Sequence, residues 1–80
     1  MSEEAEIESD IGKIYRILSL RKCPLSQRVS LYTRGIIPGK EIRLRQISPL
    51  GDPLIVEINQ QTFAINRDMW SCFDLEECRS

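Results

Sequence analysis

The chain of 80 residues contains no histidine, and this absence narrows the chemistry open to it. Histidine is the commonest general base near neutral pH and a frequent metal ligand, so sites built on imidazole are excluded. The acids cluster near the two ends of the sequence or fall on expected outer strand faces, where they cannot pair in a reaction centre. No Gly-x-x-x-x-Gly-Lys phosphate loop occurs, and no serine stands beside a recognisable base. We therefore predict that the protein is not an enzyme and needs no cofactor.

Long apolar runs and cysteine motifs are also missing. No run approaches the roughly 18 apolar residues of a membrane span, and the acidic N-terminus does not resemble a secretory signal, so we expect a cytosolic protein. The three cysteines, Cys23, Cys72 and Cys78, lack the spacing of a disulfide framework or a zinc site. Cys72 and Cys78 would share one face of a straight strand, but buried or incidental thiols remain the favoured interpretation and no metal site is predicted.

The net charge of −1 conceals three regions of different charge. Residues 1–10 carry five acids and no base, residues 11–67 carry ten bases and three acids, and residues 68–80 carry four acids and one base. We expect residues 1–10 to be a flexible acidic leader and residues 11–80 to form a single domain. A basic middle favours an acidic protein, a nucleic acid or an anionic membrane surface as partner. Charged strand edges that resist aggregation are the alternative.

Apolar residues in alternation predict about five short strands. The expected strands are 13–20, 41–47, 54–58, the segment around Phe63 and Ile65, and 72–76. The first strand has an ambiguous phase, and Ile47 indicates a bulge near Gln46. Residues 24–34 read as one short helix, in which Leu25, Val29 and Tyr32 share a stripe that Leu31 widens. The pattern predicts a mainly β fold, a small barrel with one short helix inserted after the first strand.

Turn chemistry is concentrated between residues 31 and 53. Gly35 stands where a helix would need a left-handed closing residue. Pro38-Gly39 hands the chain to a strand, and Gly51-Asp52-Pro53 turns it again. We therefore assign structural roles to the glycines and prolines of these turns: Gly35, Pro38, Gly39, Gly51 and Pro53.

The order of these elements resembles the FeoA family, the ferrous iron transport protein A family. The matching residues and segments are Leu31, Gly35-Ile36-Ile37-Pro38-Gly39, the strand 42–47, Pro49-Leu50-Gly51-Asp52-Pro53, the apolar run 54–58, Phe63-Ala64-Ile65 and Arg67-Asp68. The resemblance implies a small cytoplasmic SH3-like barrel without known catalytic activity. It also implies action with FeoB, the membrane protein with a GTPase domain that imports ferrous iron, and thus recruitment to the inner face of the membrane.

The expected docking surface combines the inserted helix with its flanking turns, because inserted segments commonly carry function. Its residues are Leu31, Tyr32, Arg34, Ile36, Ile37, Leu50 and Asp52. Core packing is the alternative for the large apolar members, and ordinary turn chemistry is the alternative for Asp52. Arg34 stands where the family usually has leucine.

Nucleic-acid binding is the second function considered. Arg43 and Arg45, on one expected strand face, could follow a phosphate backbone. The aromatic residues do not interleave with these arginines as a base-stacking surface requires, which makes nucleic acid the less favoured partner. A weak homo-oligomer is also compatible with the sequence.

Overall fold

The computed structural model describes residues 10–78, so most of the expected acidic leader lies outside the described residues. The elements follow in the order β1 (Ile14–Ser19), α2 (Leu25–Thr33), β2 (Glu41–Ile47), β3 (Leu54–Ile58), β4 (Gln61–Ile65), α3 (Arg67–Ser71) and β5 (Asp74–Glu77). The mainly β fold with a helix after the first strand is thereby confirmed. A second short helix, α3, which the sequence pattern did not predict, follows β4.

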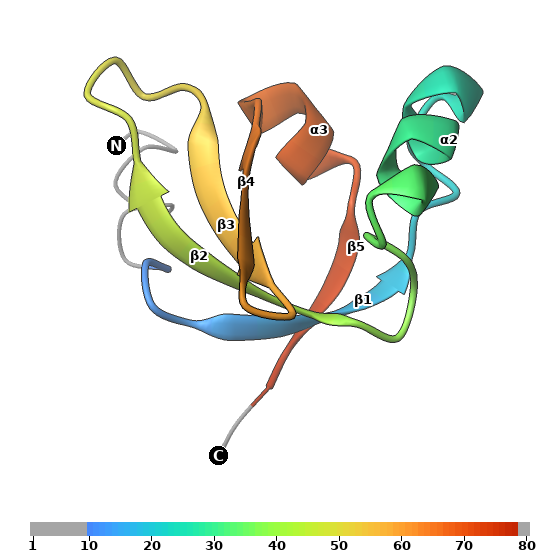
Figure 1. Ribbon diagram of the computed structural model, residues 1–80, viewed down its shortest axis with the longest axis horizontal. Helices are drawn as coiled ribbons and strands as arrows, with labels where there is room; N and C mark the ends of the chain where they lie inside the picture. The colour runs from blue at the N-terminus through green and yellow to red at the C-terminus, as the bar shows by residue number, and fades with distance from the viewer. Residues whose placement is uncertain (1–9, 79–80) are drawn as a thin grey trace.

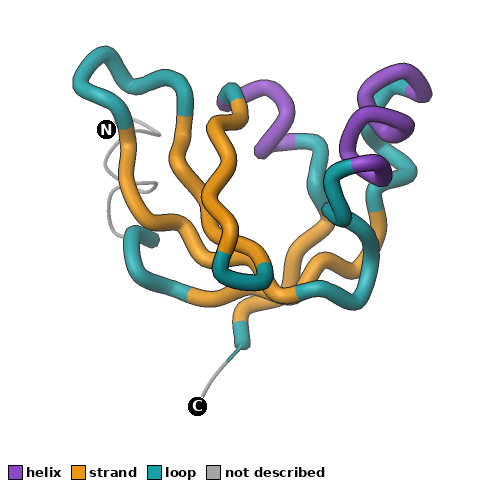
Figure 2. Tube along the Cα trace, in the orientation of Figure 1, coloured by secondary structure: helices purple, strands orange, loops and turns teal. Residues whose placement is uncertain are grey.

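The five strands form one antiparallel sheet in the order β4-β3-β2-β1-β5. The sheet is strongly curved, with α3 between its two edge strands and α2 at one outer corner (Figure 1). Within residues 10–78, no backbone pairing joins β4 to β5, so the sheet curls without closing. The path of the loops is easiest to follow in Figure 2, where the β2–β3 loop rises on the side opposite α2.

Local irregularities explain where the expected alternation holds and where it fails. The pairing of β2 with β3 shifts between Leu44 and Gln46, which confirms the bulge. The pairing of β1 with β5 shifts between Ile17 and Ser19. That second bulge resolves the ambiguous phase of β1, because it allows Ile17 and Leu20, three positions apart, both to be buried while Leu18 faces solvent.

The core is entirely apolar among the residues described. Its buried side chains are Ile17, Leu20, Cys23, Leu31, Ile36, Ile42, Leu44, Leu54, Val56, Ile58, Ile65 and Phe73. Trp70 of α3 covers one end of this core and contacts Tyr15 edge-to-face, with ring centroids 6.0 Å apart. Burial of apolar area is the main source of stability in a domain of this size.

The C-terminal strand and the cysteines differ from expectation. β5 begins at Asp74 rather than at residue 72. The preceding residues form α3, which Asn66 starts by accepting a hydrogen bond from the Met69 amide. Cys72 is the C-terminal cap of this helix. Cys72 therefore shares no strand face with Cys78. It forms a disulfide with Cys23 across the molecule, and Cys78 is free. The interpretation of Cys23 and Cys72 as buried or incidental thiols was wrong, because the two are joined in a disulfide, although Cys23 is indeed buried.

Candidate docking surface

The C-terminal end of α2 is closed by a hydrogen-bonded turn that buries two of the expected docking residues. Gly35, at φ +83°, donates its amide to the Tyr32 carbonyl, and the Ile36 amide donates to the Leu31 carbonyl. This is the Schellman arrangement, in which a left-handed glycine ends the helix and an apolar pair flanks it. Leu31 and Ile36 are that pair, and both are fully buried. Their assignment to partner contact is therefore corrected to core packing.

The opposite side of α2 carries an apolar stripe that faces solvent. Leu25 is 68% exposed, Val29 is 57% exposed and Tyr32 is 50% exposed. These three residues, hereafter the α2 stripe, are spaced by four and three positions and so lie on one helix face. Leu31 does not widen the stripe, because about 100° of helical rotation separates it from Tyr32. Three neighbouring apolar side chains exposed on a nine-residue helix are unusual for a surface that only meets water.

Basic residues frame the α2 stripe. Arg21 and Lys22 precede the helix and Arg34 follows it, all three exposed. The sequence has no acid between residues 11 and 40. In the described part of the chain, the ion pairs join Lys13 to Asp10 and Arg residues of the sheet to glutamates, so these three cations form none. The combination suits a partner whose apolar patch is edged by acids.

Ile37 and the turn after it hold the chain that leaves this surface. The Lys40 amide donates to the Ile37 carbonyl at 3.2 Å, with Gly39 at φ +94°. A proline followed by a left-handed glycine is the arrangement of a type II turn, which agrees with the structural roles assigned to Pro38 and Gly39. Ile37 itself is half-buried beside the fully buried Ile36. Its side chain is thus partly open to a partner.

The β2–β3 loop holds the remaining expected docking residues. Leu50 is 94% exposed. Asp52 has a structural partner, because its Oδ1 accepts a hydrogen bond from the Arg67 amide at 3.0 Å, and Arg67 Nε donates to the Gly51 carbonyl. These bonds tie the loop to the first residue of α3. The turn interpretation of Asp52 therefore has direct support.

The two parts of the expected surface do not meet. Figure 1 shows the β2–β3 loop and α2 at opposite sides of the molecule, with α3 between them. Tyr32 belongs to α2, and Arg34 and Ile37 belong to the segment directly after it, whereas Leu50 belongs to the β2–β3 loop. Sequence reasoning also missed Leu25 and Val29 as members of the surface. Their shared stripe with Tyr32, in a segment without acids, was the available signal.

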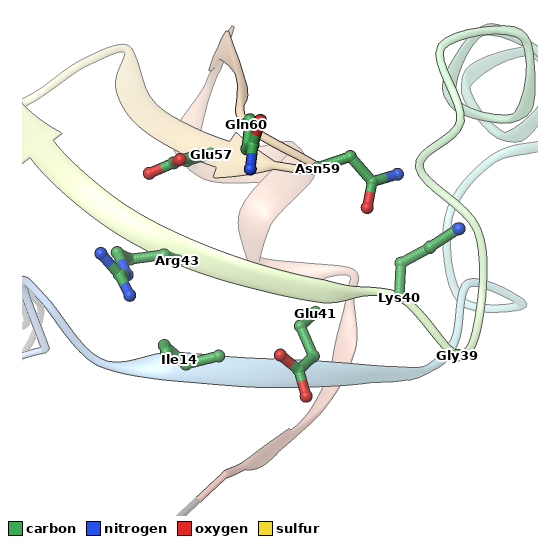
Figure 3. A pocket seen from close by; sticks show the side chains of 8 residues that line it. All are labelled: Ile14, Gly39, Lys40, Glu41, Arg43, Glu57, Asn59 and Gln60. Carbon is green, nitrogen blue, oxygen red and sulfur yellow. The ribbon is translucent and has the colours of Figure 1, made fainter.

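The outer face of β2 bears on the nucleic-acid alternative. A shallow hollow there is lined by Ile14, Gly39, Lys40, Glu41, Arg43, Glu57, Asn59 and Gln60 (Figure 3). Glu41 and Glu57 place carboxylates beside its two cations, and Arg45 pairs with Glu57 at 2.6 Å. The lining contains no aromatic ring. Such a surface lacks the continuous positive charge and stacking rings that single strands need.

Two further findings concern metals and membranes. Over residues 10–78, no three side chains of the types that ligate metals (His, Cys, Asp or Glu) come together. None of the helices described is both long and apolar enough to cross a bilayer.

Comparison with solved structures relates this fold to iron transport proteins. Iron(II) transport protein A from Clostridium thermocellum is 27% identical with a TM-score of 0.77, and the match covers 84% of this chain and 41% of that one. FeoA from Chlorobium tepidum is 20% identical with a TM-score of 0.79, over 85% of this chain and 64% of that one. This chain thus spans about two fifths and just under two thirds of these two structures.

A third structure identifies the kind of fold. FeoA from Stenotrophomonas maltophilia, solved in complex with zinc and described as a prokaryotic SH3 domain protein, is 19% identical with a TM-score of 0.67. That match covers 82% of this chain and 81% of that one. The five strands and two short helices are accordingly an SH3-like fold.

The sequence itself gives the family. No curated protein sequence matches the chain. The family model for the FeoA domain matches residues 8–72, which is most of the chain and includes all elements from β1 to α3. This chain therefore belongs to the FeoA family, which is associated with ferrous iron transport.

Proposed function

We propose that this FeoA-family chain is a non-enzymatic accessory of ferrous iron uptake that docks onto the cytosolic GTPase region of a FeoB-type transporter. It would act in the cytosol and reach the inner face of the membrane by that docking. The observation that carries the proposal is the α2 stripe with its frame of cations that form no ion pair within residues 10–78. Exposed apolar side chains surrounded by charge of one sign are the anatomy of a protein interface.

The docking surface comprises the α2 stripe together with Arg34 and Ile37. Burying three large exposed side chains removes apolar area from water and supplies affinity, while the cations select an acidic partner and speed association. A second copy of the chain is a poor occupant, because the basic frames of two copies would face each other. Leu50 is a second contact that a partner reaches separately.

Binding of the purified chain to the isolated GTPase region of the transporter tests the proposal. Val29→Asp places a charge in the stripe and should weaken binding by about tenfold or more, as interface centres often show. Ser30→Asp is the matched control, since Ser30 is also exposed on α2 but lies off the stripe. Equal losses of affinity in the two variants would mean that the added negative charge, and not contact with the stripe, weakens binding. If the parent chain does not bind the GTPase region, the proposal is wrong.

The same assay separates the nucleic-acid alternative. Random single-stranded RNA should not compete with the transporter region at physiological salt. Salt-sensitive RNA binding that Arg43→Glu abolishes and Val29→Asp leaves intact would favour the second function.

A further inference from the structure

The disulfide between Cys23 and Cys72 joins the loop directly before α2 to the end of α3. Cys23 lies in the loop between β1 and α2, and Cys72 is the C-terminal cap of α3. The two residues are 49 positions apart in sequence, with Cα atoms 5.1 Å apart. A bond between such distant segments is the one covalent link that ties α2 to the rest of the described domain, apart from the chain itself.

The position of Cys23 makes this bond important for α2. Cys23 precedes Pro24, which starts the helix without a side-chain capping bond. Of the nine residues of α2, all of which are described, Leu31 alone is buried, and it lies near the C-terminal end. In the N-terminal half, Leu25 and Val29 are exposed and Gln27 and Arg28 are only half-buried. This half therefore has no fully buried side chain of its own, and the disulfide of Cys23 fixes the chain directly before it.

We propose that Cys23 and Cys72 form a thiol–disulfide exchange site that controls the order of α2, and so the presentation of the α2 stripe. The proposal rests on the proposed docking function. Disulfides in a cytosolic protein are usually transient, catalytic or redox-sensing. The oxidised chain holds the stripe in place and binds the transporter region, whereas the reduced chain loses that pre-organisation and binds more weakly.

The exchange partner is a dithiol reductant, and Cys72 is the sulfur that it attacks. Cys72 is half-buried whereas Cys23 is buried, so Cys72 is the more accessible residue of the pair. A reductant thiolate bonds to Cys72 Sγ, the Cys23–Cys72 bond breaks, and Cys23 leaves as a thiolate that takes up a proton. The second thiol of the reductant, once deprotonated, then displaces Cys72, which is protonated in turn. Two electrons pass to the protein, and the reductant ends as its own disulfide.

The structure accommodates both thiols of the reduced form. Cys72 Sγ lies 3.0 Å from the Met69 carbonyl oxygen, which can accept a hydrogen bond from the new S–H group. Cys23 would become a neutral thiol in an apolar environment, where cysteine packs as a small hydrophobic residue. Reduction can therefore occur without unfolding of the sheet.

Hydrogen exchange on the full chain tests the inference without the transporter. The Cys78→Ser background removes the third thiol and prevents alternative pairing. In the reduced form, amides of α2 should exchange about tenfold faster than in the oxidised form, while those of β2 and β3 should change by less than about twofold. Equal exchange in α2, or an increase of the same size throughout the sheet, would overturn the inference.

Affinity for the transporter region completes the test. The oxidised chain should bind about fivefold more tightly than the reduced chain. The Cys72→Ser variant should have the affinity of the reduced chain under oxidising and reducing conditions alike. Cys23→Ser is the second variant. It also removes the disulfide, but it places a serine at a buried site, so it disturbs the packing of the core as well. Equal affinities with altered exchange would refute control of docking. If neither form binds, the proposed function fails, and the exchange data alone decide whether the pair orders α2.

Discussion

The Ile36 amide donates a hydrogen bond to the Leu31 carbonyl at 2.9 Å, and this bond divides the end of α2 into an inner and an outer side. The turn points the side chains of Leu31 and Ile36 into the core. Tyr32, one position from Leu31, is left facing solvent. The contribution of this segment to stability and its contribution to binding thus reside in different side chains, which can be varied separately.

Gly35→Val should destabilise the fold through its backbone. Gly35 adopts φ +83°, and a Cβ there would meet no atom within 4 Å, so conformation rather than space is the obstacle. A β-branched residue in the left-handed region costs about 1–3 kcal/mol. Urea unfolding should show this loss, and Gly35→Asn should show a smaller one because asparagine tolerates that region. An equal loss in both variants would contradict the conformational explanation.

Arg34→Glu should weaken docking in a salt-dependent manner. Arg34 is exposed and caps α2 through its backbone, so reversal of its charge leaves the fold nearly unchanged. Association with the transporter region should slow by about tenfold at low salt and differ little from the parent at high salt. Arg43→Glu on the sheet face is the control. A folded Arg34→Glu chain with parental association kinetics would move the site away from α2.

Leu50→Ser tests whether the β2–β3 loop is a second contact. Leu50 is nearly free of protein contacts, so the free energy of unfolding should change by less than about 0.5 kcal/mol. Titration calorimetry should show a modest loss of affinity. The loss should add to that of Val29→Asp in the double variant, since the two sites are far apart. No loss in the single variant would confine docking to the α2 corner.

Asp52→Ala should act on stability and not on docking. It removes the acceptor for the Arg67 amide at the start of α3 and should lower the free energy of unfolding by about 1 kcal/mol. Asp52→Asn retains an oxygen acceptor and should lose less. Thermal unfolding measures both. A reduced affinity for the transporter region in a fully folded Asp52→Ala chain would restore Asp52 to the docking surface.

Alkaline pH should destabilise the fold through Tyr15. Burial, followed by the nearby negative charge of Asp10, raises the pKa of Tyr15 from 10.0 to about 12. The unfolded chain therefore ionises first, and the stability that the neutral phenol supplies below pH 10 is lost as the pH rises toward 12. Denaturation at several pH values should show this slope flattened in Tyr15→Phe. An unchanged slope would assign the alkaline loss to other groups.

Local chemistry accounts for the parts of the structure that the sequence predicted well. The closing role of Gly35, the turn at Pro38-Gly39 and the bulge in β2 each depend on residues adjacent in sequence. The tight hairpin at Asn59 and Gln60, both at positive φ, is likewise local, although the sequence analysis did not single it out. Such features could be read from short segments.

Tertiary context decided what the sequence did not predict. Whether the α2 stripe or Leu31 faces the core depends on how the helix is placed by the loop before it, which apolar spacing does not encode. Cys23 and Cys72 are brought together only by the curvature of the whole sheet, since 49 positions separate them. The separation of Leu50 from α2 also depends on the whole fold. Leu50 is near the turns after α2 in the sequence, but it lies in the loop at the far end of β2.

The gap between β4 and β5 gives α3 a role as a spacer. No backbone pairing joins these edges in residues 10–78, so they are linked there by the chain of α3, which runs from the end of β4 to the start of β5. Trp70 of α3 contacts Tyr15 on β1 and Phe73 directly before β5, so this packing supports the β5 side of the opening. Substitution at Trp70 can therefore alter how α3 sits beside the sheet without any change in strand register.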